Sequence, residues 1–585
     1  MSGTNNGNGP PPGSLGASGP AGAGAFDIEG ALRTALAHHQ AGRGGEAKEL
    51  YRRVLRSDPE QADALNLLGV AVHDGGDDAE AVRLIRRAIA IDGGEAHYYT
   101  NLGNALQAAG EVDEAVAVYR RGLALDPGAA KAHNNLGTAL RARNRLTEAI
   151  ACFRRALEID GEYASAWSNL GAALAALERL DEASSALRRA LMIMPDFAEA
   201  LANLGNVLHI QGKRAEAEEA MRRALEIDPG YAMAYSNLGI LLKDLGRFEE
   251  AEESLTRALE IDPGYARAKN NFAFTLLVQG DFARAWGYYA ARDSVQEVPQ
   301  GQEIRQELWR KPLPEELNGK EILVLRDQGL GDEIFFLRFA PQLKERGAVI
   351  TYLAHAKIAP VLARLAFIDK FAKEDETPEE GDFTLSVADL PLALGMKSAA
   401  DIPASLTLAP EPGRTDAMRV KLASFGPAPY VGVTWRAGIA NKADAVFKLA
   451  PIGDIAEALR PANATVLVLQ RHPEAGEIDA LTRGLGREAH DLTALNDDLE
   501  DMLALLSLLD EYVTVSNTNV HLRAGARRAS RVLVPDPPEW RWMAEGDESP
   551  WFPGSAIYRQ GRDGDWGAAF GALTRDLYRA LGGGG

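Results

Sequence analysis

The chain has 585 residues, of which 46% are hydrophobic and 25% are charged, and its formal net charge is −20. A chain of this length is expected to form two or more domains with separate cores. The acidic excess argues against a nucleic-acid-binding protein, whose surface would need a dominant positive field. A small basic pocket for a phosphate-bearing ligand remains compatible with this charge.

The N-terminal segment, residues 1–25, is rich in Gly, Pro, Asn and Ser, and we predict a disordered tail. It contains no apolar run typical of a signal peptide, and no stretch of about 18 apolar residues occurs further on. We therefore expect a cytoplasmic protein without a membrane span. The single cysteine, Cys152, excludes a disulfide framework, and no His, Asp or Cys spacing favours a metal site, so we predict none.

A motif close to Asn-Leu-Gly returns every 34 residues through the first half of the chain. Its glycines are Gly69, Gly103, Gly137, Gly171, Gly205 and Gly239. This period is typical of tetratricopeptide repeats, each of which is a pair of antiparallel helices. We predict a superhelix over residues 26–292, with seven units between 27 and 264 and a weaker eighth unit over 265–292.

Within the unit 96–128, apolar residues recur at three- and four-residue spacing on two segments separated by Gly110. Gly103 and Ala115 stand where the two predicted helices approach each other, and Pro127 ends the second helix. The aromatic segment around Trp286 is expected to form a helix that caps the array or docks it onto the following region.

One slot of the repeat carries an asparagine in six successive units. These residues are Asn101, Asn135, Asn169, Asn203, Asn237 and Asn271, whereas Arg33 and Leu67 occupy the slot in the first two units. Asparagine is a poor helix former, so its repetition calls for a reason. Each amide offers a donor and an acceptor that match an extended peptide backbone, which predicts an acceptor-protein track. The alternatives are that the amides satisfy neighbouring helix ends or that they are relics of repeat duplication.

Blocks such as AHNNLGTAL, AWSNLGAAL and AYSNLGILL with CFRRALEID resemble the repeat superhelix of the O-GlcNAc transferases. In that family an asparagine ladder holds protein substrates, so the resemblance implies a protein partner. Tetratricopeptide arrays also occur in many scaffolds and do not by themselves imply an enzyme.

After the array, residues 293–319 form a predicted linker with three prolines, pinned by Trp309. The run 321–327 has a buried-strand pattern, and the glycine turn 328–333 leads into an apolar helix. A strand, a glycine turn and a helix begin a βαβ unit, in which Gly329 and Gly331 permit close backbone approach. Asp332 and Glu333 follow at the carboxyl end of the strand, where α/β sheets place ligands.

A second series of strands is predicted at 429–438, 466–471, 512–517 and 531–535, with a closing helix at 566–581. The predicted fold class is therefore an α-solenoid followed by an α/β region of two Rossmann-like halves, residues 320–415 and 425–585, with a cleft between them.

The ordered motifs GLGDE, VGVTWRAG, LQR and SNTNVHLRAGA resemble the GT-B glycosyltransferases of the heptosyltransferase type over most of residues 305–580. They are most similar to bacterial proteins that join tetratricopeptide repeats to such a domain, some of which glycosylate flagellin. The resemblance implies a catalytic base at Asp332, with Glu333 as the next candidate. It also implies a donor site that contains Gly329, Gly331, Arg436, Lys448 (or Lys442), Gln470, Asn517, Thr518, Asn519 and His521.

Asn517 departs from the family pattern, which has an acid followed by threonine, and so removes a negative charge. Sugar transfer needs a carboxylate to take the proton of the acceptor hydroxyl and positive charge or helix-end amides for the nucleotide phosphate. Asp332, Arg436, Lys448 and the amides after Asn517 can supply these. Alternatively, Asp332 caps a helix, Arg436 is an ordinary surface arginine and His521 packs on the sheet.

Two further clusters stand beyond the last motif. An aromatic cluster could stack on a sugar or nucleoside, but a core plug is favoured; it comprises Trp540, Trp542, Trp551 and Phe552. A basic cluster is either a solvated helix face or a site for an anionic donor such as a nucleotide-linked nonulosonic acid; it comprises Arg523, Arg527, Arg528 and Arg531.

The sequence as a whole predicts a protein O-glycosyltransferase that captures a protein acceptor, with flagellin as the leading candidate, on its repeats. It uses a nucleotide sugar as co-substrate and no other cofactor. One alternative is a non-catalytic scaffold that has kept only the fold, and another is a lipopolysaccharide sugar transferase.

Overall fold

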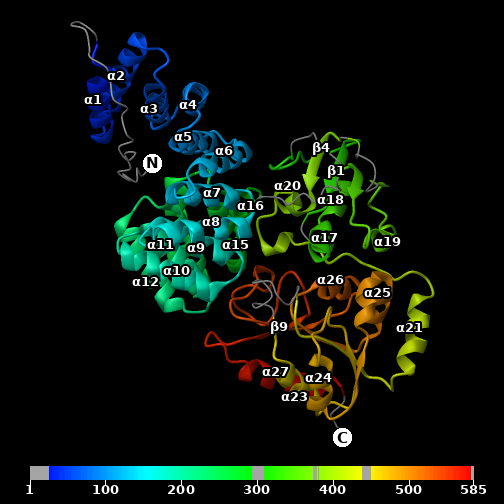
Figure 1. Cartoon of the computed structure of the whole chain (residues 1–585). Helices are drawn as coiled ribbons and strands as arrows, with labels where there is room; N and C mark the ends of the chain where they lie inside the picture. The colour runs from blue at the N-terminus through cyan, green and yellow to red at the C-terminus, as the bar shows by residue number, and fades with distance from the viewer. Residues whose placement is uncertain are drawn as a thin grey trace. The chain divides into compact units, whose positions relative to one another are not determined.

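The computed structural model describes residues 26–292, 308–327, 329–372, 379, 381–437 and 449–581 (Figure 1). The predicted tail, most of the predicted linker and both candidate lysines, Lys442 and Lys448, lie outside these residues. The chain forms two compact units, Met1–Asn237 and Leu238–Gly585. The unit boundary falls inside a repeat helix, so the last repeat helices belong to the same unit as the α/β region.

Sixteen consecutive helices occupy the described stretch from residue 26 to residue 292, coloured blue to green in Figure 1. They are α1 (Ile28–Gln40), α2 (Gly44–Ser57), α3 (Ala62–His73), α4 (Asp78–Ile91), α5 (Ala96–Ala108), α6 (Val112–Leu125), α7 (Ala130–Ala142), α8 (Leu146–Ile159), α9 (Ala164–Ala176), α10 (Leu180–Ile193), α11 (Ala198–Ile210), α12 (Arg214–Ile227), α13 (Ala232–Asp244), α14 (Phe248–Ile261), α15 (Ala266–Gln279) and α16 (Phe282–Tyr289). The predicted α-solenoid is confirmed.

The repeated glycine allows the two helices of each unit to touch. A Cβ atom on Gly103 would lie 2.4 Å from the Tyr119 ring, and one on Gly137 would lie 2.6 Å from the Phe153 ring. Both rings are buried, at 1% and 0% exposure. Packed protein cores leave no spare volume. Glycine therefore returns every 34 residues because a larger side chain would clash at this position.

Gly137→Ala is expected to destabilise the repeat unit by about 1–3 kcal/mol, because the new methyl group must displace the Phe153 ring. Gly161→Ala is the matched control: its Cβ would meet only the Leu157 carbonyl oxygen, at 3.7 Å. Urea unfolding followed by circular dichroism would measure both changes. Equal stability of the two variants would contradict the steric explanation of the repeated glycine.

The α/β region contains two fully parallel sheets. The first has the order β3-β2-β1-β4 and the second has the order β10-β9-β8-β5-β6-β7. Their strands are β1 (Glu321–Leu325), β2 (Val349–Leu353), β3 (Lys370–Phe371), β4 (Phe383–Ser386), β5 (Tyr430–Thr434), β6 (Thr465–Val468), β7 (Ala489–Asp491), β8 (Glu511–Thr514), β9 (Arg531–Val534) and β10 (Ala556–Arg559). The second sheet, read from β7, has the Rossmann order 3-2-1-4-5-6, and the first sheet has the first four strands of that order.

Helices connect the parallel strands within each sheet, link the two sheets and close the chain. They are α17 (Leu330–Leu337), α18 (Ala340–Glu345), α19 (Ala359–Leu362), α20 (Leu390–Ala393), α21 (Arg414–Ala423), α23 (Ile452–Leu459), α24 (Glu477–Leu485), α25 (Leu499–Leu508), α26 (Thr518–Gly525) and α27 (Gly567–Ala580). Short 3-10 turns add η1 (Val387–Asp389), η2 (Ala399–Asp401), η3 (Thr493–Asp497) and η4 (Trp540–Trp542). The predicted α/β class is thus confirmed, and the predicted closing helix is α27.

The last repeat helices pack directly on the α/β region. The Trp286 ring on α16 lies with its centroid 6.1 Å from that of Trp540 and 6.3 Å from that of Trp551. The backbone N–H of Ala544 donates to the Val278 carbonyl on α15, at 2.8 Å. The predicted docking helix is confirmed. The aromatic cluster is a buried plug, with Trp551 fully buried and Trp540 at 6% exposure.

The segment before β1 is held at Trp309, as the sequence predicts. Its backbone N–H donates to the Thr384 carbonyl at 2.8 Å, and its ring packs edge-on against Phe383 with a centroid distance of 4.7 Å. Both partners lie on β4, so this strap is fixed along the edge of the first sheet.

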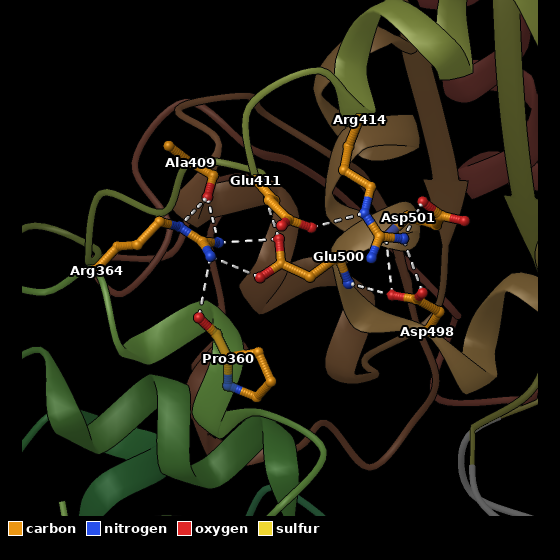
Figure 2. A network of polar contacts seen from close by, with 8 residues as sticks. All are labelled: Pro360, Arg364, Ala409, Glu411, Arg414, Asp498, Glu500 and Asp501. Carbon is orange, nitrogen blue, oxygen red and sulfur yellow. Dashed lines mark hydrogen bonds and ion pairs between the residues drawn. The ribbon is translucent and has the colours of Figure 1, made fainter.

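Arginines on either side of α25 tie the first sheet's helices to the second half (Figure 2). Arg364 donates to Glu500 at 2.9 Å and to the Ala409 carbonyl at 2.6 Å. Arg414 contacts Asp498 at 2.9 Å and Asp501 at 2.8 Å. Arg364, which follows α19, and Arg414, which begins α21, therefore both form ion pairs at the start of α25.

Asp498 also caps α25 by accepting the backbone N–H groups of Glu500 and Asp501. Burial raises the pKa of this carboxyl, but the Asp501 N–H and the Arg414 guanidinium outweigh burial and hold the pKa below its usual range. The charged form is therefore favoured in the folded protein. Its contribution is present above the unfolded pKa, about 3.9, and is lost as the pH falls through the folded pKa.

Asp498→Asn keeps the cap and removes the charge, so it is expected to lower stability at pH 7 by about 0.5 kcal/mol, because solvent screens this half-exposed pair. The difference from the wild type should shrink as the pH falls below about 4. Urea titrations at several pH values would measure it, with Asp416→Asn on the exposed face of α21 as control. A difference that grows on acidification would contradict the assignment.

Candidate functional site

The carboxyl ends of both sheets face a common cavity of about 340 Å³. The turn after β1 opens α17, Arg436 follows β5, and Asn517 follows β8 and opens α26. Pairs β1–β4 and β5–β8 are the places where the strand order reverses in each sheet, and α/β sheets bind ligands there. The cavity is lined by Gly329, Leu330, Gly331, Asp332, Thr434, Arg436, Ala437, Leu469, Arg471, His472, Asn496, Ser516, Asn517, Thr518, Asn519, His521, Glu539 and Arg541.

The structure brings together most of the residues that the sequence pointed to. Eight of them line the cavity: Gly329, Gly331, Asp332, Arg436, Asn517, Thr518, Asn519 and His521. Gln470 and Glu333 do not line it, and Lys448 is outside the described residues.

Asp332 lies at the mouth of the glycine turn, in the first turn of α17. Its carboxylate forms an ion pair with Arg541, which also pairs with Glu539. The Gly329 N–H donates to the same carboxylate at 3.4 Å, which is a long hydrogen bond. Asp332 therefore acts only as a weak cap of α17, the alternative role considered in the sequence analysis. Asp332 is therefore a partly exposed carboxylate, oriented mainly by one guanidinium.

Arg541 is the main site residue that sequence reasoning missed. It lies 4.5 Å above the Phe335 ring and 4.6 Å above the Trp540 ring, measured to the ring centroids. Burial lowers its pKa, but Asp332 and Glu539 more than compensate and the pKa is raised. A signal was available in the sequence, since an arginine and an acid inside the aromatic segment 535–543 need partners when buried.

Glu333 was predicted as the second candidate base, and its placement does not support this. It is buried at 1% exposure, accepts a hydrogen bond from the Tyr352 hydroxyl at 2.8 Å and accepts the His355 N–H at 3.2 Å. Neighbouring residues on a helix point about 100° apart, so Asp332 faces the cavity while Glu333 faces β2. Glu333 fixes α17 on the first sheet.

Arg436 is buried at 7% exposure, which excludes the ordinary surface arginine that the sequence left open. Its guanidinium contacts Glu477 at 2.7 Å. Gln470 accepts the backbone N–H of Arg436 at 2.9 Å and donates to the Arg436 carbonyl at 3.1 Å. Gln470, predicted to bind the donor, instead holds the strand end that carries Arg436.

Asn517 caps α26, because its side-chain oxygen accepts the backbone N–H groups of Asn519 and Val520. Its amide nitrogen donates to the Thr514 hydroxyl at 2.7 Å, and that hydroxyl already donates to the Val515 carbonyl. A carboxylate at position 517 would lack the donor that this arrangement uses. The departure from the family pattern therefore has a local structural reason.

His521 both lines the cavity and packs on aromatic rings. Its ring lies 5.7 Å from Phe335 and 5.2 Å from Phe552, measured between centroids. A Cβ atom on Gly331 would lie 3.1 Å from the histidine ring. The second glycine of the turn is thus needed so that α17 and α26 can approach each other.

The basic cluster does not face the cavity. Arg523 is buried and donates to the carbonyls of Ala529 at 2.6 Å and Leu506 at 2.7 Å. Arg531 pairs with Glu511 at 2.8 Å, and Arg527 donates to the Thr407 hydroxyl. These arginines hold the β8–β9 connection together, so the argument for an anionic donor loses its basis.

The asparagines of the repeat file bond to preceding units. Asn101 donates to Asn66 at 3.0 Å, Asn135 donates to Asn104 at 2.8 Å, and Asn169 donates to Asn134 at 3.0 Å. These three bonds join asparagine side chains within the helices of successive units and do not involve helix ends. Asn203 and Asn271 are half-buried and Asn237 is buried. An amide has three or more bonding positions, so these bonds use only part of its capacity.

Comparison with known proteins identifies the repeats. Two tetratricopeptide-repeat family models match, one over residues 162–229 and 196–264 and the other over residues 32–96, 100–164 and 236–297. The first sixteen helices are a tetratricopeptide-repeat solenoid.

Protein FlbA of Caulobacter vibrioides is 24% identical over 324 residues, which span 52% of this chain and 53% of FlbA. The match thus covers about half the length of that relative.

Solved structures are similar over smaller parts. YrrB, described as a tetratricopeptide protein with an unusual peptide-binding site, is 30% identical, with a TM-score of 0.26 over 32% of this chain and 95% of YrrB. MamA is 24% identical, with a TM-score of 0.26 over 27% of this chain and 93% of MamA. The Cut9–Hcn1 hetero-tetramer is 17% identical, with a TM-score of 0.37 over 44% of this chain and 51% of that chain.

Two negative findings apply to the described parts of the chain. In these parts, the His, Cys, Asp and Glu side chains form no group of three or more that could hold a metal ion. Of the helices seen there, none has the length and apolar character needed to cross a membrane.

Asn517→Ala is expected to destabilise the protein by about 1 kcal/mol through loss of the cap, and Asn517→Asp by less, because the carboxylate keeps the acceptor and loses only the bond to Thr514. Thermal and urea unfolding would give the order wild type, Asn517→Asp, Asn517→Ala. An aspartate variant more stable than the wild type would show that the Thr514 bond does not explain the asparagine.

Proposed function

We propose that the protein is a glycosyltransferase that transfers a sugar from a nucleotide-sugar donor to a hydroxyl group of a protein acceptor. The observation that carries the proposal is the shared cavity at the carboxyl ends of two Rossmann-type sheets. A carboxylate from one sheet, Asp332, and a guanidinium from the other, Arg436, line this one cavity. This arrangement supports a GT-B fold, in which two such halves enclose the donor.

The second sheet offers what a nucleotide phosphate needs. Arg436 stands at the end of β5, and Thr518 and Asn519 in the first turn of α26 line the same cavity. Arg471 and His472 line the cavity as well. Together these groups would stabilise the negative charge that develops on the leaving phosphate.

The transfer is then a displacement at the anomeric carbon. The acceptor oxygen forms a bond to that carbon, the bond from the carbon to the phosphate oxygen breaks, and the nucleotide leaves with the electron pair. Asp332 takes the proton of the acceptor hydroxyl. Arg541 orients the Asp332 carboxylate and is itself also paired with Glu539.

The repeats supply the protein-binding half of the proposal. Tetratricopeptide solenoids present extended surfaces to protein partners, and the asparagines of the repeat file other than Asn237 are half-buried. Flagellin is the first acceptor to test, because bacterial proteins that resemble this architecture modify it.

A non-catalytic scaffold is the second candidate, and one observation favours it. The Asp332 carboxylate is already paired with Arg541, which opposes its action as a base. In that case the α/β region would bind a nucleotide without catalysis, or bind no ligand, and the protein would function only through partner binding by the repeats.

The test uses the full chain with a panel of nucleotide sugars that includes UDP-N-acetylglucosamine and a CMP-nonulosonate. Asp332→Asn is expected to keep donor binding and to reduce transfer to flagellin by about 10²–10⁴-fold. Arg436→Met is expected to weaken donor binding at least tenfold, as measured by calorimetry. Arg419→Met, an exposed arginine on α21, is the control and should bind the donor normally.

The two candidate functions give different results in this experiment. If no nucleotide sugar raises the melting temperature of the wild type and none is consumed, the scaffold is correct. If Asp332→Asn transfers at a near-normal rate, the proposed base is wrong while the activity stands. Circular dichroism of each variant separates a loss of folding from a loss of function.

A further inference from the structure

A second cavity adjoins the candidate donor site. It has a volume of about 490 Å³ and shares four lining residues with the first cavity, namely Asp332, Ser516, Glu539 and Arg541. Ser516 donates to Glu539 at 2.7 Å, so the four shared residues form one polar boundary between the two spaces. The candidate base therefore faces two cavities, and the proposed function assigns an occupant to only one of them.

The chemistry of the second cavity differs from that of the first. Away from the shared residues it is lined mainly by apolar groups: Phe274 and Tyr289 of the last repeat helices, Leu533, Val534, Pro535, Pro537 and Pro538 at the end of β9, and the two tryptophans of η4. The first cavity has Arg436, Arg471, His472 and several asparagines instead. A phosphate fits the first cavity, and an apolar ligand that carries a hydroxyl group fits the second.

The second cavity continues to the repeats. A third cavity of about 210 Å³ shares Phe274, Pro537, Pro538, Glu539 and Trp540 with it and reaches Lys243 and Phe248, on α13 and α14. Asn271, the last asparagine of the repeat file, precedes Phe274 by three residues on α15 and so lies one turn away on the same helix. The second and third cavities share these lining residues and lie between the last repeat helices and Asp332, and we call the two together the passage.

The walls of this passage are held in place. The loop after β9 is bonded to α15 through Ala544 and Val278, and Arg559 donates to the carbonyls of Trp542 at 2.6 Å and Met543 at 3.1 Å. Trp540 and Trp542 are buried. Backbone bonds and aromatic packing therefore fix the loop that lines the passage.

We propose that this passage binds an extended polypeptide segment and delivers a serine or threonine hydroxyl to Asp332. The inference rests on the proposed function and names the chemistry of its acceptor: a hydroxyl residue flanked by small apolar residues. Pro535, Pro537 and Pro538 have no backbone N–H, so at these positions the loop offers carbonyl acceptors, which suit the N–H donors of an extended peptide.

The donor and the acceptor would thus occupy neighbouring cavities that meet at the boundary formed by Asp332, Ser516, Glu539 and Arg541. The acceptor oxygen approaches from the apolar passage, and its proton goes to Asp332 as the bond to the anomeric carbon forms. Phe274 lines both parts of the passage and is half-buried, which makes it the residue to test.

The experiment measures binding to the full chain of a short fluorescent peptide in which threonine and serine alternate with valine and alanine. Phe274→Ala is expected to weaken peptide binding about tenfold, by fluorescence anisotropy, and to leave nucleotide-sugar binding unchanged. Arg267→Ala, at an exposed position of the same helix that lines neither cavity, should bind the peptide normally. If Phe274→Ala does not fold, Phe274→Leu replaces it, with a smaller loss expected.

A photo-crosslinking amino acid at position 274 provides an independent measurement. It should crosslink the peptide, whereas the same amino acid at Val420, an exposed position on α21, should not. Absence of peptide binding to the wild type, unchanged binding to the Phe274 variants, or equal crosslinking at both positions would overturn the inference. Peptide crosslinks at 274 in a protein that binds no nucleotide sugar would support the passage and refute the proposed transferase.

Discussion

The candidate site depends on one buried cation. Arg541 lies among Phe335, Phe336 and Trp540, and a guanidinium in such surroundings needs anionic partners to offset its loss of hydration. Those partners come from two different places, Asp332 in the turn after β1 and Glu539 in the loop after β9. The pairing therefore ties the first sheet to the second and sets the boundary that both cavities share. Loss of the cation would leave two carboxylates without compensation at the centre of the site.

A second buried arginine joins the repeats to the same region. Arg292, just after α16, contacts Asp389 and Asp327 at 2.6 Å each and the Ser386 hydroxyl at 3.1 Å. Burial raises the pKa of Asp389, although Arg292 lowers it. Asp327 lies two residues after β1 and directly before the glycine turn, and Asp389 lies three residues after β4. The segment that follows α16 is thus bonded to residues just after the two strands next to the candidate base.

Several residues in this protein both stabilise the local structure and line the candidate site. Asn517 caps α26 while it faces the cavity, and His521 packs on two phenylalanines beside the glycine turn. Such residues cannot be assigned from the sequence, because a helix cap and a ligand contact use the same side-chain atoms. Gln470 and Glu333 illustrate the other outcome: both were expected in the site, and both instead support the residues that line it. Their buried positions follow from neighbours that are distant in the sequence.

Elements that depend on short-range or periodic sequence patterns could be predicted from the sequence alone. The 34-residue glycine period, the strands β1, β5, β6, β8 and β9, and the closing helix were all predictable, since each depends on apolar spacing and nearby turn residues. Strands β2, β3, β4, β7 and β10 were missed, because short parallel strands have little pattern of their own and form only beside a neighbour. The pairing of charged side chains, in contrast, could be seen only in the three-dimensional structure. Arg541 and Asp332 are separated by more than two hundred residues, and the pairing that defines both cavities arises because two sheets present their carboxyl ends to one another.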